Sequence, residues 1–579
     1  MSKVLSTIVT VFLAAICALV YYLALPAVTL HSAGFWWFIL LCLVSISISI
    51  TCFCYDSFEI PIGASWIVTA ACLVIFAVCG LISGMMFHSD EARQVADITE
   101  SERLIVEDFT DITTEDNFNN LPLVDLDTAK MLGDKKVAQL KHASWYDVDD
   151  EYNLIQYQGK YYRLSVIDYG DYWTYRKAKN EGLPGYVLVS ATSRNGAVTQ
   201  EATIVQLDKA IRYSPGAFWS YDLRRHLRSQ YPSYIFDESY LEIDEEAVPY
   251  WITGVKRPTA GVFGVKTVTS FIVTNAQTGE SQEYSIEEAP EWIDHIFSLS
   301  YLMDIAEWHY AYVDGFWNNV FSKTNVWRTS YFFRDRHGND SESEAGKFAN
   351  FFGYSSIIQD GQVMFYTGLT AANSAESNLG WLIIDTSSGK MTEYRFFDEA
   401  TDDYASGAEE SSAQAAVEQL VQAMGYEATF PLPVNIAGEP SYIMCLKGKA
   451  GLIQAYAICN IDNFSIAVQA DTLDKALDLY LGRLGKESIY DTTNDTSSES
   501  TPETDVPEVE TQEVTGKIVE VYTAEVNGTT QFYYVIGEDL YRSSIKLNEL
   551  QVTWKVGDEL TISYYEDGAI RVATDINKN

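Results

Sequence analysis

The densest groups of side chains that could bind or react lie in two neighbouring segments. The segment IRYSPGAFWSYDLRRHLRSQYP, residues 211–232, holds three arginines: Arg224, Arg225 and Arg228. The segment LEIDEEAVPYW follows it and holds four acidic residues: Glu242, Asp244, Glu245 and Glu246. Guanidinium groups bind phosphate and carboxylate, and a pair of carboxylates can act as general acid and base. These two segments are therefore the candidates for a binding or catalytic site.

Each segment has more than one interpretation. Ser214, with a proline after it, predicts the start of a helix that carries Arg224 and Arg228 on one polar face. The arginines could form internal ion pairs with the acidic segment, or bind an anionic wall polymer or a partner. The acidic residues could form a solvated loop, hold calcium loosely, or supply Glu242 and Asp244 as the carboxylate pair of an enzyme.

The usual catalytic and metal-binding motifs are missing from the sequence. The seven histidines are scattered, without an HExxH or a C-x-x-C zinc motif. The sequence also lacks the GxxxxGK[ST] phosphate loop and the G-x-S-x-G nucleophile motif. His295 and His309 fall in a predicted helical stretch, 290–314, where we interpret them as structural side chains. We therefore predict no catalytic residue, no metal site and no cofactor.

Three apolar runs near the amino terminus predict membrane-spanning helices: Val4–Leu25, Phe35–Cys54 and Trp66–Phe87. Each is close to the ~20 residues that a helix needs to cross a hydrocarbon core of ~30 Å. Gly80 and Gly84 lie four residues apart in the third run, where the missing side chains would let a second helix approach. That helix could be another span of the same chain or, in a homo-oligomer, a span of a second copy.

The orientation of the spans does not follow from charge, because Lys3 and the amino terminus balance Arg93 and Arg103. An odd number of spans places the two ends of the chain on opposite sides of the membrane. Beyond the apolar runs the chain has only two cysteines, Cys445 and Cys459, so this part would tolerate an oxidising exterior. We predict a multi-pass protein of the cell membrane with a cytoplasmic amino terminus and an extracellular carboxy-terminal domain.

The charge of the chain limits its partners. The formal net charge is −41 at pH 7, and the predicted spans contribute almost none of it. Such an acidic surface repels nucleic acid. We therefore expect no nucleic acid among the partners, which are the membrane itself and a protein or wall polymer.

Short strand-like runs, turn residues and a few amphipathic helices follow the spans, which predicts the α+β class. Composition divides the chain into seven segments. These are 1–87, a three-span membrane anchor; 88–120, an acidic stalk; 121–260, a first α+β module; 261–400, repeated hairpin modules; 401–486, a helix–hairpin–helix α+β module; 487–513, an acidic disordered linker; and 514–579, a small OB-like β-barrel.

An internal repeat links two hairpins. FIVTNAQTGESQEYSI, residues 271–286, aligns without a gap with WLIIDTSSGKMTEYRF, residues 381–396. Each copy predicts a strand, a polar turn ending in Gly279 or Gly389, and a second strand. These copies resemble PepSY-type repeats, which are extracytoplasmic modules linked to protease inhibition or envelope regulation.

A broader resemblance covers about residues 121–484. The arginine segment, EIDEEAVPYWI, APEWID, GAEESSAQAAVEQL and EPSYIMCLKGKAGLIQAYAICNI occur in the same order as in a group of large uncharacterised membrane-anchored proteins of Gram-positive bacteria. The resemblance implies an envelope protein whose body lies outside the cell, and it brings no catalytic residues.

The sequence thus predicts a membrane-anchored, extracytoplasmic cell-envelope protein that binds or regulates another envelope component. The alternative is an enzyme that acts on a cell-wall polymer through the carboxylates near Glu242 and Asp244.

Overall fold

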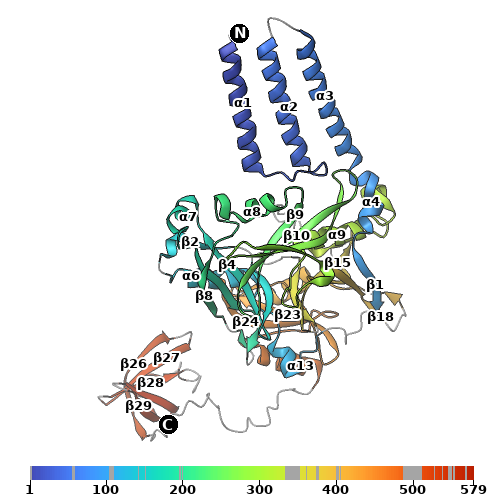
Figure 1. Cartoon of the computed structure of the whole chain (residues 1–579). Helices are drawn as coiled ribbons and strands as arrows, with labels where there is room; N and C mark the ends of the chain where they lie inside the picture. The colour runs from blue at the N-terminus through green and yellow to red at the C-terminus, as the bar shows by residue number, and fades with distance from the viewer. Residues whose placement is uncertain are drawn as a thin grey trace. The chain divides into compact units, whose positions relative to one another are not determined.

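The structure, a computed structural model of the chain, describes residues 3–54, 59–103, 110–140, 142–149, 152–194, 197–198, 200–332, 353–359, 361–372, 377–398, 403–404, 406–486, 512–526, 529–537, 539–544, 551, 554–567 and 570–578. The chain divides into two compact units, Met1–Tyr490 and Asp491–Asn579. The first unit contains three long helices and a body of sheets and helices, and the second is a small all-strand unit (Figure 1). The protein is of mixed α+β class, as predicted.

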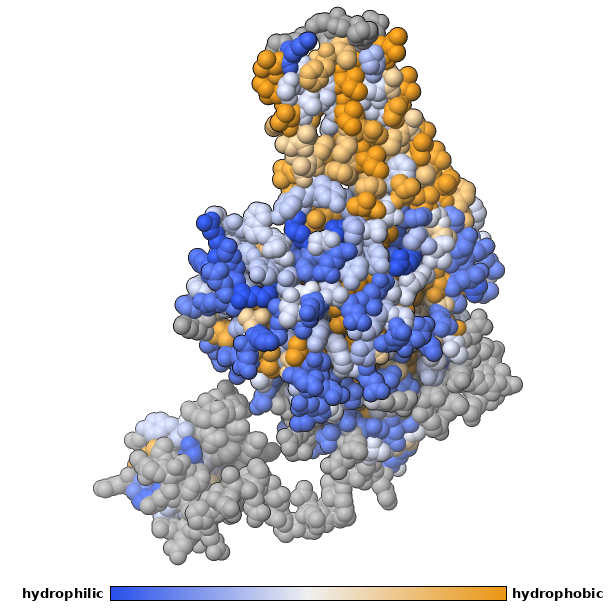
Figure 2. All heavy atoms as spheres, in the orientation of Figure 1, coloured by the Kyte–Doolittle hydropathy of each residue, from blue (hydrophilic) through white to orange (hydrophobic). Residues whose placement is uncertain are grey.

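Three helices near the amino terminus are long and apolar enough to cross a membrane: α1 (Lys3–Ala24), α2 (Ala33–Cys54) and α3 (Glu59–Ile82). Their apolar surface forms a band at one end of the unit, next to the hydrophilic surface of the body (Figure 2). The prediction of three helices long and apolar enough to span a membrane is confirmed. The third helix begins and ends earlier in the chain than predicted, and its earlier end is explained by Gly84, which takes an extended conformation and caps the next helix, α4 (Met85–Arg93).

Small polar side chains join α2 to the other two spans. Ser6 of α1 donates through Oγ to the carbonyl oxygen of Cys52 at 2.8 Å. The hydroxyl groups of Ser47 on α2 and Thr69 on α3 lie 2.9 Å apart, and both side chains are buried. Because lipid tails are as apolar as the helices, such polar contacts and close packing hold spans together.

The glycines of the third predicted run, Gly80 and Gly84, have no described atom of another span close to the position of a side chain. A Cβ atom on Gly80 would find open space. The nearest atom to a Cβ on Gly84 would be the carbonyl oxygen of Leu81, in the preceding helix. Packing through these glycines, between spans of one chain or between two copies of the chain, stays a prediction.

The body contains four main sheets. The first has five strands: β2 (Tyr146–Val148), β3 (Asn153–Tyr157), β4 (Lys160–Tyr169), β5 (Leu183–Ser190) and β8 (Ala202–Ile211). The second has four in the order β12-β11-β10-β9: β9 (Ile235–Ile243), β10 (Pro249–Ala260), β11 (Val265–Asn275) and β12 (Ser281–Ser285). The third has seven: β1 (Asp97–Arg103), β13 (Trp327–Thr329), β14 (Ser355–Gln359), β15 (Gln362–Ala371), β16 (Ser377–Asp385), β17 (Lys390–Arg395) and β20 (Gly407–Ala408). The fourth has five: β21 (Glu427–Ala428), β22 (Leu432–Ile436), β23 (Glu439–Lys447), β24 (Ile453–Asn460) and β25 (Ala467–Ala470).

Helices and two small ribbons complete the body. The helices are α5 (Glu115–Asn119), α6 (Leu126–Val137), α7 (Tyr172–Ala178), α8 (Leu223–Gln230), α9 (Leu299–Ala311), α10 (Gly315–Trp317), α12 (Glu410–Leu420) and α13 (Leu473–Leu484). Short 3-10 or π turns are η2 (Ala143–Trp145), η3 (Trp219–Tyr221), η4 (Ile286–Glu288) and η5 (Asn318–Ser322). The ribbons pair β6 (Ser193–Arg194) with β7 (Ala197–Val198), and β18 (Phe397–Asp398) with β19 (Asp403–Tyr404).

The hydrophobic cores lie between sheets. One core joins the first two sheets through residues such as Tyr186 and Trp251, and another joins the second and third sheets through Phe271 and Leu382. Further cores join the third to the fourth sheet and the fourth to the first, where α6 and α13 also pack. The predicted boundary at residue 260 falls at the end of β10, which pairs with β11 in the same sheet. The body therefore packs as one unit.

In the segment predicted to be an acidic stalk, 88–120, the described residues 88–103 and 110–120 are instead part of the body. Its strand β1 pairs in parallel with β17. Ile112 and Phe118 are buried in a core, with 0 % and 3 % of their surfaces exposed. The correction has a simple cause, because single apolar residues among acidic ones show no periodicity in sequence but can still fill gaps in a core.

The repeated hairpins fold in the same way. Asn275 and Asp385 begin the two turns, and the side-chain Oδ1 of each accepts hydrogen bonds from two following backbone N–H groups. Gly279 and Gly389 end the turns with φ of +79° and +73°, which favours glycine. The strands on either side are β11–β12 and β16–β17. The likeness to PepSY-type modules stays a prediction.

The second unit contains β26 (Gln512–Val526), β27 (Thr529–Ile536), β28 (Asp539–Ser544), β29 (Glu559–Asp567) and β30 (Ile570–Lys578). The strand order is β26-β27-β28-β30-β29, and β26 also pairs with β29. Its classification as an OB-like barrel stays a prediction. Of the predicted linker, residues 487–511 lie outside the described residues.

Candidate functional site

The three arginines lie on α8, on the side of the body that faces the spans (Figure 1). The helix begins later than predicted, because its N-cap is Asp222, whose carboxylate accepts the Arg225 N–H at 2.7 Å. Ser214, the predicted cap, instead donates its hydroxyl to the buried carboxylate of Asp168 at 2.8 Å. The arginine helix is thus only the second half of the predicted one.

Arg228 is buried, with 7 % of its surface exposed, and its guanidinium donates to four backbone carbonyl oxygens. One belongs to Leu25, directly after α1, at 3.2 Å. The other three lie in the turn after α8, and the shortest bond, 2.6 Å, goes to Tyr234. Burial lowers the pKa of Arg228 to about 10, and the positive charge of Arg224 acts in the same direction. Arg228 therefore remains charged at neutral pH, and all its contacts are structural.

Arg225 also contacts the end of α1. Its guanidinium donates to the carbonyl oxygen of Tyr22 at 2.6 Å and lies 3.9 Å from the centre of the Tyr22 ring. Arg224 is exposed and forms no hydrogen bond or ion pair with any described residue. Two of the three arginines thus hold the carboxyl end of α1, where free carbonyl groups and the helix dipole favour cations. The predicted ion pairs with the acidic segment are not formed among the described residues.

Glu242, the first acidic residue, lies on β9 and is completely buried. Its Oε1 accepts the backbone N–H of His295 at 3.1 Å and lies 2.9 Å from Nδ1 of the same residue. Burial raises the pKa of Glu242 well above its usual value and lowers the pKa of His295 to about 4. Burial and the charge of Glu242 also raise the pKa of Asp294 to about 7. This group is therefore a buried polar contact that favours neutral forms.

The other three acidic residues belong to the turn between β9 and β10. Asp244 accepts the backbone N–H groups of Glu246 and Val248 at 3.1 Å and 2.8 Å. Glu245 and Glu246 are exposed. The structure therefore does not bring Glu242 and Asp244 together, because one faces the core and the other faces its own turn.

Two further buried carboxylates were missed in the sequence. Glu307 on α9 pairs with Arg328 at 2.7 Å, and Glu410 on α12 accepts from Ser330 at 3.2 Å and Asn378 at 3.1 Å. Burial raises the pKa of Glu307 to about 7 and that of Glu410 to about 8. No local pattern separates these residues from exposed helix glutamates, because distant segments bury them.

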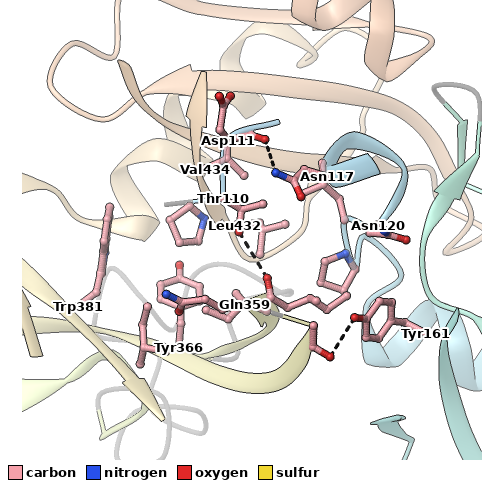
Figure 3. A pocket seen from close by; sticks show the side chains of 17 residues that line it. Thr110, Asp111, Asn117, Asn120, Tyr161, Gln359, Tyr366, Trp381, Leu432 and Val434 are labelled. Carbon is pink, nitrogen blue, oxygen red and sulfur yellow. Dashed lines mark hydrogen bonds between the residues drawn. The ribbon is translucent and has the colours of Figure 1, made fainter. Parts of the chain in front are cut away.

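A cavity of about 570 Å³ lies between the segment 110–122, the β14–β15 hairpin, β22 and β4 (Figure 3). Trp381 and Tyr366 lie at one end of the view, and Tyr161 lies at the other. The polar lining residues are Thr110, Asp111, Asn117, Asn120 and Gln359. The apolar lining residues include Ile357, Ile383, Leu432, Pro433 and Val434. This is a ligand-sized space with an apolar floor and hydrogen-bonding groups.

The lining of this cavity is better suited to binding than to chemistry. The carboxylate of Asp111 already accepts the N–H and hydroxyl of Thr113 at 2.9 Å and 2.7 Å. Asn120 is exposed and Gln359 half-exposed, and an amide side chain both donates and accepts hydrogen bonds without a charge. The sequence signal for this site was the asparagine-rich run EDNFNNLP, which was assigned to the stalk.

Within the described part of the chain, no three histidine, cysteine, aspartate or glutamate side chains are grouped to hold a metal ion. No protein-family model matches the chain, and the search of curated proteins returns no match.

Proposed function

We propose that this protein is a membrane-anchored component of the cell envelope whose extracytoplasmic body binds another envelope component, without catalysing a reaction. The PepSY-like hairpins and the OB-like second unit would be further binding modules of the same protein. The observation that carries the proposal is the cavity of Figure 3, which combines apolar side chains with the amides of Asn120 and Gln359, while its carboxylate, Asp111, is already hydrogen-bonded to Thr113. Such a lining suits an uncharged polar chain, such as a peptide or a glycan of the wall.

The junction between spans and body supports a role that depends on the membrane. α8 holds the end of α1, and the backbone N–H of Val28 donates to the carbonyl oxygen of Pro232 at 2.8 Å. His31 lies 2.9 Å from the carbonyl oxygen of Val262, in the β10–β11 turn. A body held this firmly presents its cavity at a set orientation to the membrane. The enzymatic alternative has no comparable support, since Glu242 faces the core and Asp244 faces its own turn.

Site-specific photo-crosslinking in cells tests the proposal. A photoreactive side chain replaces Asn120 at the cavity in the full-length protein, and Lys177 on α7, which is exposed outside the cavity, serves as the matched control. We expect a discrete adduct from position 120 that disappears in the Gln359→Arg variant, which places a charge at the rim. Equal adducts at both positions, or turnover of a wall polymer by the purified protein, would contradict the proposal.

A further inference from the structure

A second cavity, of about 560 Å³, lies where the first two spans meet the body. On the membrane side it is lined by Ala24 and Leu25 at the end of α1 and by Gly34 at the start of α2. On the body side α8, β9 and β10 line it. The cavity therefore lies at the level at which two spans leave the hydrocarbon core.

Aromatic residues mark the same level as the boundary of the membrane. Tyr21 and Tyr22 lie on the last turn of α1, and Trp36 and Trp37 lie on the first turn of α2. The side chain of Trp37 is 62 % exposed on the surface of the spans. Tryptophan and tyrosine gather at the interface between lipid and water, where the ring is in contact with apolar groups and the polar edge with water. The cavity thus lies at the level of the lipid headgroups.

The charge of the cavity differs from that of the rest of the protein. Its lining holds three basic and two acidic side chains, whereas the chain as a whole is strongly acidic. Lys256 forms an ion pair with Asp237 at 2.7 Å. The guanidinium of Arg228 donates its hydrogen bonds to backbone carbonyl oxygens. Glu238 accepts the hydroxyl of Ser300 at 3.1 Å. Of the three basic side chains, Arg224 is the one without a hydrogen bond or ion pair to a described residue.

Arg224 has the chemistry of a phosphate ligand. Arg224 is exposed, lines the cavity and pairs with no described residue, and its positive charge is close enough to Arg228 to lower the pKa of Arg228. A planar guanidinium binds phosphate oxygens in a bidentate manner. Leu25, Leu227 and Ala24 add apolar walls beside it, along which the upper part of an acyl chain can lie.

We propose that this cavity binds the headgroup of a membrane phospholipid, with the phosphodiester against Arg224. The lipid would fill the space between the spans and the body, and would complete the junction that Arg225 and Arg228 form with the end of α1. This inference depends on the three spans and is independent of the ligand in the cavity of Figure 3.

Lipid retention by the full-length protein tests the proposal. The protein is purified in a detergent without phosphorus, phosphatidylglycerol is added, and the bound lipid is counted by native mass spectrometry. Wild type should bind one phospholipid, and Arg224→Ala should weaken that binding about ten-fold, the effect of losing one charge-assisted contact. Arg176→Ala is the matched control, because Arg176 is exposed on α7 and outside the cavity lining, and it should bind as wild type does.

Two outcomes would overturn the proposal. One is equal lipid binding by wild type and Arg224→Ala, with both proteins folded by circular dichroism. The other is displacement of the lipid by millimolar inorganic phosphate as fully as by excess lipid, which would show a site for free phosphate. Resistance to phosphate together with loss in Arg224→Ala supports a lipid site.

Discussion

At the scale of single residues, the ionisable groups singled out by their chemistry are mostly structural. Glu242, Glu307 and Glu410 are each removed from water and held by hydrogen bonds from His295, Arg328, or Ser330 and Asn378, respectively. Burial disfavours the charged carboxylate, which is why their pKa values rise. A shifted pKa in this protein therefore reports a packed interior, and only geometry separates such groups from a site.

The pH dependence of stability should report the burial of Glu410. Its pKa is about 8 in the folded state and 4.5 in the unfolded chain, so between these values the folded state holds one more proton than the unfolded state. Stability from this group is therefore complete below pH 4.5 and is lost as pH rises toward 8, by at most about 1.4 kcal/mol per pH unit. We expect Glu410→Gln to gain stability relative to wild type as pH rises from 5 to 8.

Chemical denaturation in detergent at several pH values measures this difference. Glu287→Gln is the control, because Glu287 is exposed, and its free energy of unfolding should follow that of wild type. A difference between Glu410→Gln and wild type that does not change with pH would show that Glu410 is already ionised in the fold.

At the scale of elements, the short helix α8 acts as a clamp on the first span. The last carbonyl groups of any helix lack intrahelical partners, and in α1 two arginines from α8 satisfy the carbonyls of Tyr22 and Leu25. The span α2 is joined to its neighbours by serine and threonine side chains instead. Arginines thus hold the carboxyl end of α1 against the body, whereas hydroxyl groups join the spans to one another.

Replacing Arg228 and Arg224 one at a time should show that Arg228 stabilises the fold and that Arg224 does not. Arg228→Ala leaves four carbonyl acceptors without this donor, and we expect it to lower the free energy of unfolding by about 3 kcal/mol. Arg224→Ala removes an exposed side chain and should change it by less than about 0.5 kcal/mol in lipid-free detergent. Thermal and chemical unfolding followed by circular dichroism gives both values. Equal losses for the two variants would contradict the clamp.

At the scale of the whole molecule, spans and body belong to one compact unit, and the strand-only unit after residue 490 is separate from it. The connector between α1 and α2 contacts the body through His31 and Val28, so this connector and the body lie on the same side of the membrane. The amino-terminal end of α1 and the carboxyl end of α2 lie at the end of the spans away from the body (Figure 1). One accessible position in each part is therefore enough to assign the topology.

Labelling of intact cells should place the body outside. Cys445 and Cys459 are buried, with 1 % and 0 % of their surfaces exposed, so they contribute little background. We expect Lys475→Cys, at an exposed position on α13, to react with a membrane-impermeant maleimide on intact cells, because the body is exposed there. Lys3→Cys should react only after the membrane is permeabilised. The reverse pattern would place the body in the cytoplasm and exclude a wall-facing function.

Much of the architecture could be predicted locally. The three spans depend only on composition and length, and the two hairpin turns depend on Gly279 and Gly389 together with the polar residue that opens each turn. The capped helix predicted at Ser214 could not be judged locally, since a buried Asp168 competes for that hydroxyl. The stalk was wrong for the same reason, because Ile112 and Phe118 pack against segments hundreds of residues away.

The sequence by itself determined that three segments are long and apolar enough to span a membrane, that the chain is mixed α+β and strongly acidic, and which side chains could carry chemistry. These properties depend on residue types and short-range spacing. Only the tertiary structure decided that Arg225 and Arg228 hold the first span, that Arg224 remains free beside a cavity, and that Glu242 and Asp244 face different surroundings. These relations depend on contacts between residues about 50 to 200 positions apart, which the packing of the sheets brings together and which no local pattern contains.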